Sequence, residues 1–139
     1  MDKSISTMAL QIAEAARTFE QVRTGHVPKS VTVAQSEGTL VITLHEALSQ
    51  AERALARTPT GAALLQYFHR RLFTHSADTL RCEIKRITGV GVREPVAEVE
   101  TKSDPAVQEF TSDTMVQVFL LAHKIPADTW SGSGTVEQS

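Results

Sequence analysis

The histidines, the single cysteine and the serine–aspartate pairs are the side chains of this 139-residue chain that could carry out chemistry. His45-Glu46 begins like the zinc-binding motif of metalloproteases, but no second histidine follows at the required helical spacing. His69 and His75 are six residues apart, so they do not share a helix face closely. The sequence therefore predicts no metal site.

Nucleophiles and phosphate-binding loops are equally hard to find. Cys82 lies beside the apolar positions of a predicted helix, which is typical of a small buried residue, and no histidine–acid constellation accompanies it. The Ser-Asp pairs at 103–104 and 112–113 are typical of turns, where both side chains bond nearby backbone. The glycines of residues 89–92 are not followed by a predicted helix, unlike those of a dinucleotide-binding loop. We expect neither an enzyme nor a cofactor.

Composition and charge describe an ordinary globular protein, with 41% apolar and 22% charged residues and a net charge of -2. This charge predicts no attraction to nucleic acid. Residues 1–93 carry 12 basic and 8 acidic residues, whereas residues 94–139 carry 2 basic and 8 acidic ones. The lone thiol fits a reducing compartment, no signal peptide is visible, and the longest apolar run is too short to span a membrane. We expect a cytoplasmic protein without a membrane span.

The first half of the chain predicts one helix, a hairpin and two further helices. A first helix ends at Gly25, because apolar residues recur there every three or four positions (Ile5, Met8, Ile12, Ala15, Phe19 and Val22). Strands with alternating apolar residues cover Val31–Val33 and Leu40–Leu44, joined by a turn at 36–38. A capping box at Ser49–Glu52 opens a short helix. Thr58-Pro59 then opens a long helix that ends at Gly89, with a stripe of apolar residues (Leu64, Leu65, Phe68, Leu72, Leu80, Ile84 and Ile87).

The second half predicts two strands, from Val90 to about Val99 and from Met115 to Leu121. Between them residues 103–110 are echoed by residues 112–119, with serine, aspartate, valine, glutamine and phenylalanine at matching places. The repeat offers either two candidate segments for one strand position or an extra strand in the sheet. Residues 125–139, which include Trp130, predict a flexible polar tail.

Together these elements predict an α+β domain over residues 1–124, in the order α-β-β-α-α-β-β. About four strands form an antiparallel sheet, and helices cover one of its faces. Edge strands left by two short hairpins favour pairing with a second copy, so we expect a homo-oligomer. The long helix also places four cations, Arg70, Arg71, Arg81 and Lys85, within about 100° of each other. They form either a solvated helix face or a docking surface for an acidic partner.

Several segments resemble the MpsC-like family of small bacterial proteins. They are Gly25–Pro28, the hairpin Val31–Leu44, Leu48–Ala56, Thr58–Gly61, Ile84–Gly89 and Val116–Phe119. The chain departs from the family at Gln50, where proline is usual, and in the nine-residue repeat. The resemblance implies a link to a sodium-translocating, membrane-potential-generating system with inorganic-carbon transport.

The function most consistent with these observations is that of a non-enzymatic accessory or regulatory protein. It would bind a protein partner, such as a membrane transport component, through Arg70, Arg71, Arg81 and Lys85. The alternative is a domain that binds a small ligand in a cleft between sheet and helix. A third hypothesis, an enzyme with scattered catalytic residues, would require a pocket of clustered polar groups.

Overall fold

The computed structural model describes residues 7–93, 106–111, 114–125, 130 and 134–137. Its elements follow the order α1 (Met8–Thr24), β1 (Ser30–Ser36), β2 (Thr39–His45), α2 (Gln50–Leu55), α3 (Pro59–Thr88), β3 (Ala106–Thr111), β4 (Thr114–Leu120) and β5 (Gly134–Glu137). The α+β class is confirmed, and the long helix is continuous over 30 residues.

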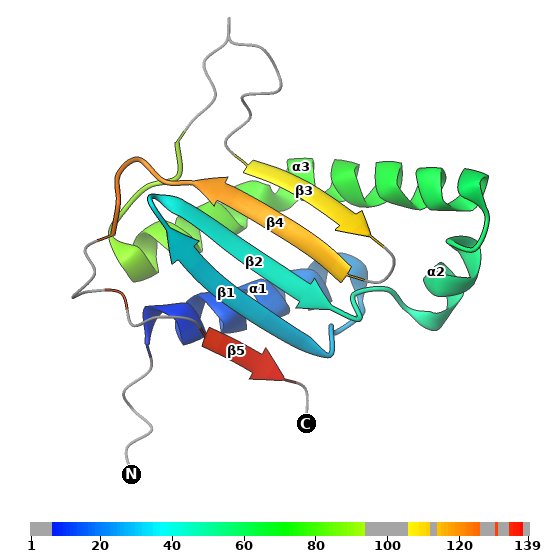
Figure 1. Ribbon diagram of the computed structural model, residues 1–139, viewed down its shortest axis with the longest axis horizontal. Coiled ribbons are helices and arrows are strands. Elements are labelled where there is room, and N and C mark those ends of the chain that lie inside the picture. The colour runs from blue at the N-terminus through cyan, green and yellow to red at the C-terminus, as the bar shows by residue number, and fades with distance from the viewer. Residues whose placement is uncertain (1–6, 94–105, 112–113, 126–129, 131–133, 138–139) are drawn as a thin grey trace, which may run out of the picture.

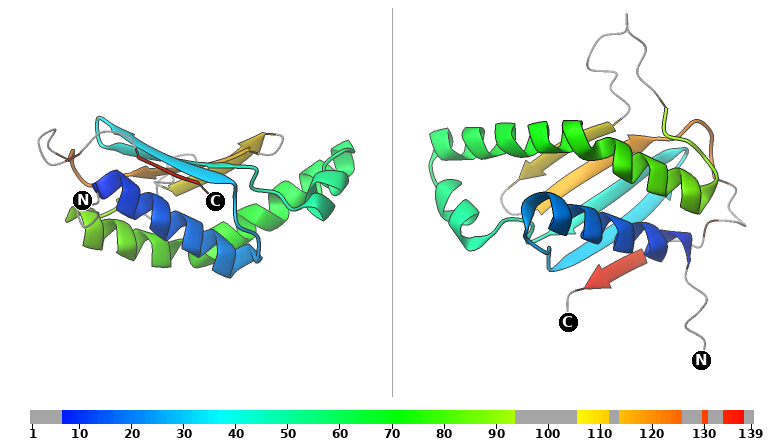
Figure 2. Two further views of the ribbon diagram at one scale, coloured as in Figure 1. Left: turned by 90° about the horizontal axis from the view of Figure 1, so that it is seen from below. Right: turned by 180° about the vertical axis from the view of Figure 1, so that it is seen from behind.

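The strands form one antiparallel sheet in the order β3-β4-β2-β1-β5, so it has five strands rather than about four (Figure 1). Helices α1 and α3 lie side by side on one face of the sheet and run in opposite directions (Figure 2). The core lies between this helical layer and the inward-facing residues of β1, β2 and β4, whose exposure alternates along each strand.

The first hairpin agrees with its sequence prediction. Ser36 pairs with Thr39 across a two-residue turn, in which Glu37 has φ 51° and Gly38 has φ 81°. Positive φ at both central positions is the turn geometry that matches the twist of paired strands, and glycine adopts it without strain. Val31, Val33 and the alternate residues of β2 therefore face the core.

The second hairpin differs from its prediction. The two copies of the nine-residue repeat supply β3 and β4, which pair with each other from Ala106↔Phe119 to Thr111↔Thr114. The repeat thus forms an extra strand in the sheet rather than two alternative segments for one strand position. Of the strand predicted from Val90 to Val99, the structure describes residues 90–93, in which Val92 forms a bridge with Leu121, and the rest of the predicted strand lies outside the described residues.

The C-terminal segment also departs from the predicted flexible tail. Residues 134–137 form β5, which pairs with the edge of β1, and Trp130 is only 9% exposed. The residues of β5 carry no apolar pattern that predicts a strand. The strand forms through backbone hydrogen bonds to β1, which is distant in the sequence, so the local sequence does not reveal it. Self-association through the sheet edges stays a prediction.

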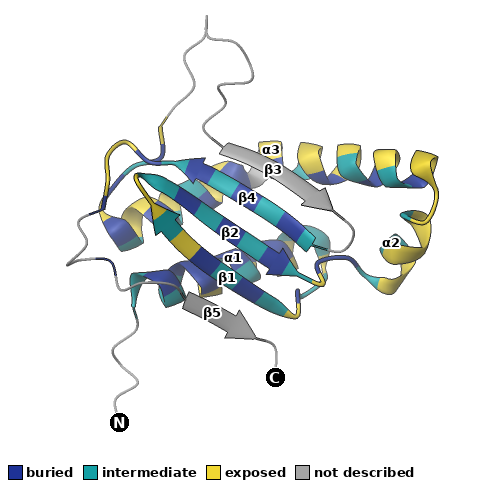
Figure 3. Ribbon diagram, viewed as in Figure 1, coloured by how far each residue is buried: buried dark blue, intermediate teal, exposed yellow. Residues whose placement is uncertain are grey.

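The apolar stripe of α3 was placed wrongly in its first half. The buried positions include Leu65, His69, Phe73 and Ala77, whereas Leu64 and Phe68 are 58% and 54% exposed. Because a helix has 3.6 residues per turn, buried residues spaced four apart shift gradually around α3. The helix therefore crosses the sheet obliquely. Its first turns, together with α2, extend past the end of the sheet, where exposed positions recur on every turn (Figure 3).

Two further residues contradict the burial expected of them. Cys82 is exposed rather than packed in the core. Val22, the last residue of the predicted stripe on α1, is 81% exposed, while the polar Glu20 two positions earlier is fully buried. The buried face of α1 is therefore rotated toward Ala9, Ala13 and Ala16, whose small side chains allow close packing.

Candidate interaction surface on the helical layer

The four cations predicted to bind a partner all lie on α3 but are not equally accessible. Arg70, Arg71 and Lys85 are exposed. Arg81 is half-buried and donates to the Asp78 carboxylate at 3.3 Å. The guanidinium of Arg71 lies over the ring of Tyr67, 5.7 Å from its centroid. Ion pairs at the surface contribute little to stability. The contacts of these four cations therefore give no structural reason for the cluster.

A buried ion pair lies within α1, and its arginine also reaches α3. The side chains of Glu20 and Arg23 are 0% and 3% exposed, and Arg23 Nη2 lies 2.5 Å from Glu20 Oε1. A second nitrogen of Arg23, Nη1, is 3.4 Å from the His69 carbonyl oxygen, and the guanidinium also lies over the Phe19 ring. Sequence reasoning missed this pair, although its i, i+3 spacing was visible.

A second buried contact fixes α2 against α3. His69 is 1% exposed, and its Nε2 lies 2.8 Å from Glu52 Oε2. The other oxygen of Glu52 accepts from the Ser49 backbone N–H at 2.8 Å, which completes the predicted capping box. Glu52 therefore caps its own helix and also holds α3, a role the capping motif alone could not reveal.

Glu52 should make stability depend on pH. Burial raises its pKa, but hydrogen bonds from the Ser49 backbone and from His69 outweigh burial and hold the pKa of Glu52 below its usual 4.5. A carboxylate with a lowered pKa contributes stability that is complete above its unfolded pKa and is lost as pH falls through the folded pKa. Chemical denaturation should therefore show that Glu52→Gln loses less stability than the wild type between about pH 5 and pH 3.

The exposed Glu14 provides the control for this measurement. Glu14→Gln should keep the acid-side loss of the wild type, since that carboxylate is bonded only to Arg17 at the surface among the described residues. An equal acid-side loss in Glu52→Gln and in the wild type would contradict the role given to the His69–Glu52 contact.

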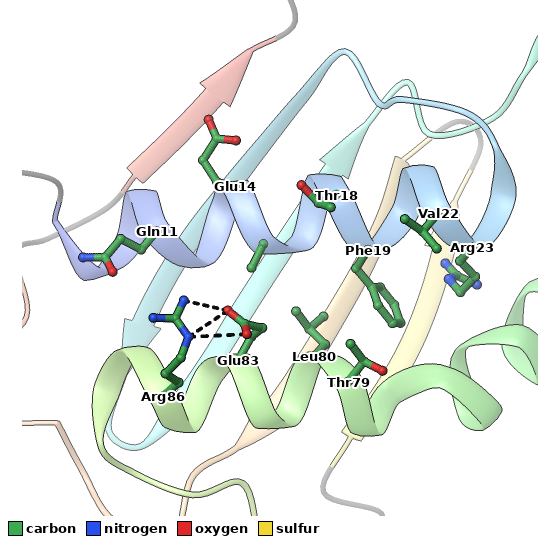
Figure 4. A pocket seen from close by; sticks show the side chains of 11 residues that line it. Gln11, Glu14, Thr18, Phe19, Val22, Arg23, Thr79, Leu80, Glu83 and Arg86 are labelled. Atoms are coloured by element: carbon green, nitrogen blue, oxygen red, sulfur yellow. Dashed lines mark hydrogen bonds and ion pairs between the residues drawn. The ribbon is translucent and has the colours of Figure 1, made fainter.

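A groove runs between α1 and α3 on the side of the helices that faces away from the sheet (Figure 4). Its volume is about 720 Å³. The lining residues are Gln11, Glu14, Ala15, Thr18, Phe19, Val22 and Arg23 from α1, and Thr79, Leu80, Glu83 and Arg86 from α3. This groove lies between two helices, a position that depends on their tertiary packing, whereas the cleft between sheet and helix stays a prediction.

The groove combines an apolar floor with a charged rim. Phe19 and Leu80 form its buried base, and Val22 extends into solvent from α1. On the rim, Arg86 donates to Glu83 at 2.7 Å, and this hydrogen bond, against a small effect of burial, holds the pKa of Glu83 below its usual value. Such a surface can bind an apolar segment and select its orientation through charge.

Within the described residues, no group of three or more histidine, cysteine, aspartate or glutamate side chains could hold a metal ion. No helix in the same part of the chain is long and apolar enough to cross a membrane.

Comparison with known proteins identifies one family. The model of the family described as "Na+-translocating membrane potential-generating system (MpsC)" matches residues 5–117. Searches of curated proteins and of solved structures found no match. Because the matched range covers most of the sequence, this chain belongs to the MpsC family.

Proposed function

We propose that this chain is a non-enzymatic accessory protein of a Na+-translocating, membrane-potential-generating system, and that it acts by binding a protein partner at the cytoplasmic side. The family description names the system. The groove between α1 and α3 is the observation that carries the binding mode, because it presents the 81% exposed Val22 of α1 above an apolar base formed by Phe19 and Leu80.

The groove suits an amphipathic helix of the partner. Its α1 wall runs from Gln11 to Arg23, which corresponds to about 18 Å of helix, or roughly three turns. Recognition of this kind places apolar residues of the incoming helix into a groove between two others. Arg23, held by the buried Glu20, also donates to the His69 carbonyl of α3, so the α1 wall is already placed against α3 when the partner binds.

The four cations of α3 provide a second, electrostatic component. Arg70, Arg71 and Lys85 project from the solvent side of α3, and Arg81 lies between them with its partner Asp78. Charges at the edge of an interface mainly raise the association rate and act through screened electrostatics. We propose that they attract an acidic region of the same partner.

Substitution of Val22 tests the groove. Val22→Glu places a charge in the apolar groove at a position that is 81% exposed, so folding should change by no more than about 0.5 kcal/mol. Capture from membranes of the native cell should recover a protein of the Na+-translocating system with the wild type and at least about tenfold less with Val22→Glu, since a charge buried in an apolar contact is strongly unfavourable. Ala34→Glu, an exposed site on the opposite face of the sheet, is the matched control.

Charge reversal tests the cations. The triple variant Arg70→Glu, Arg81→Glu, Lys85→Glu should retain its fold and lose most of the partner, and wild-type capture should weaken with added salt. Reversal of Lys29, Arg93 and Lys124, three exposed cations elsewhere, should leave capture unchanged. Full retention of the partner by the first triple variant would reduce the cations to a solvated helix face.

A small-molecule ligand is the second candidate, because the groove volume of about 720 Å³ lies in the range of ligand pockets. Native mass spectrometry distinguishes the two. A bound compound would add a constant mass that Val22→Glu removes, whereas the protein-binding account expects the mass of the chain alone.

A further inference from the structure

The end of the molecule formed by α2 and the start of α3 exposes a cluster of large apolar side chains. Here residues 49–72 are called the helical tip. Leu64, Tyr67 and Phe68 are 58%, 61% and 54% exposed and follow the i, i+3, i+4 spacing of one helix face. Figures 1 and 3 show that α2 and the first turns of α3 project past the end of the sheet. No described element covers these side chains.

Leu55 joins the same cluster from α2. It is 46% exposed. A side chain at Gly61 would collide with the Leu55 carbonyl oxygen, so α2 meets α3 at that glycine. Because Gly61 precedes Leu64 by three residues and Phe68 by seven, it shares their helix face, so the backbone of Leu55 meets α3 on that face.

The charge around the cluster has one sign. The helical tip contains four arginines, Arg53, Arg57, Arg70 and Arg71, and a single carboxylate, Glu52. All four arginines are exposed. Glu52 is half-buried and bonds Ser49 and His69. The exposed surface of the tip is therefore apolar and aromatic at its centre and cationic around it.

We propose that the helical tip docks on the surface of a bilayer that contains anionic lipid. Tyrosine, phenylalanine and leucine enter the boundary between headgroups and acyl chains, while arginines at their side bind lipid phosphates. A projecting end can reach a flat surface, whereas helix-binding proteins present a groove. A second copy is disfavoured, because two tips would bring eight arginines together, four from each chain.

Docking of the tip uses none of the residues that line the groove between α1 and α3, but it shares Arg70 and Arg71 with the cations proposed to attract the protein partner. It is therefore measured with purified chain and vesicles alone, without any protein partner. Purified wild-type chain should co-sediment with vesicles of phosphatidylcholine and phosphatidylglycerol at low salt. Binding should fall with added salt and be weak on phosphatidylcholine alone.

Variants separate the two components of the surface. Leu64→Gln/Phe68→Gln should reduce binding by at least about tenfold through lost apolar contact. Arg70→Gln/Arg71→Gln should reduce it by about fivefold for each arginine. Arg93→Gln/Lys124→Gln removes the same charge at exposed sites outside the tip and should bind like the wild type. Circular dichroism should show that all three variants are folded.

Three results would overturn the proposal. The first is absence of wild-type binding to the anionic vesicles at low salt, which would leave an acidic protein as the occupant of the tip. The second is equal binding to both kinds of vesicle. The third is equal binding by the wild type and by both tip variants, which would place the contact elsewhere on the chain.

Discussion

Truncating Arg23 to alanine should lower the free energy of unfolding by about 3–5 kcal/mol, the largest effect expected for a charged residue of this chain. The substitution leaves the fully buried Glu20 carboxylate without its guanidinium partner. An uncompensated charge in the interior costs far more than the lost hydrogen bond itself. Denaturation by urea or guanidinium chloride measures the loss directly.

Two comparisons show whether burial is the cause. Arg17 forms the same i, i+3 contact with Glu14, but those side chains are 28% and 56% exposed, so Arg17→Ala should cost no more than about 1 kcal/mol. Replacing both buried partners, with Glu20→Leu and Arg23→Met, should recover most of the stability. A loss for Arg23→Ala as small as that for Arg17→Ala would mean that water reaches the Glu20 carboxylate.

Phe119→Ala should cost about 3–5 kcal/mol, as expected for truncation of a buried aromatic side chain. Phe119 is fully buried on β4 and lies opposite Leu40 of β2. Its ring meets that of Phe73 edge-on, with centroids 5.8 Å apart. The contact joins the sheet to α3, so its loss weakens packing between the two layers.

The neighbouring residue on the same strand is the control. Val118 is only half-buried and points to the face of the sheet away from the helices, so Val118→Ala should cost clearly less than Phe119→Ala in the same denaturation experiment. Equal losses would show that the second face of the sheet is also covered, which the described residues do not indicate.

Local signals allowed much of the fold to be predicted. The capping box at Ser49, the proline after Thr58 and the turn at Gly38 each specify backbone geometry within a few residues, and all three are present as expected. Where pairing joins distant segments, the sequence was less informative. The β5 strand depends on hydrogen bonds to β1, and the β3 strand depends on its pairing with β4.

The candidate surfaces were harder to predict for a related reason. An apolar stripe identifies a helix, but its neighbours determine which part of the stripe is buried. Phe68 fits the spacing of the predicted stripe, yet its side chain is 54% exposed. His69 was set aside because no metal motif included it, although the buried positions Leu65 and Phe73 lie four residues to either side.

Site-specific photo-crosslinking in the cell that encodes this chain tests the central claim most directly. A benzophenone side chain placed at Val22 would sit in the groove, and one placed at Ala34 would sit on the opposite face of the sheet. We predict that illumination joins the Val22 probe, and not the Ala34 probe, to a protein of the Na+-translocating system. Adducts of equal yield at both positions, or none at Val22, would contradict the proposal that this protein works by binding a partner in the groove between α1 and α3.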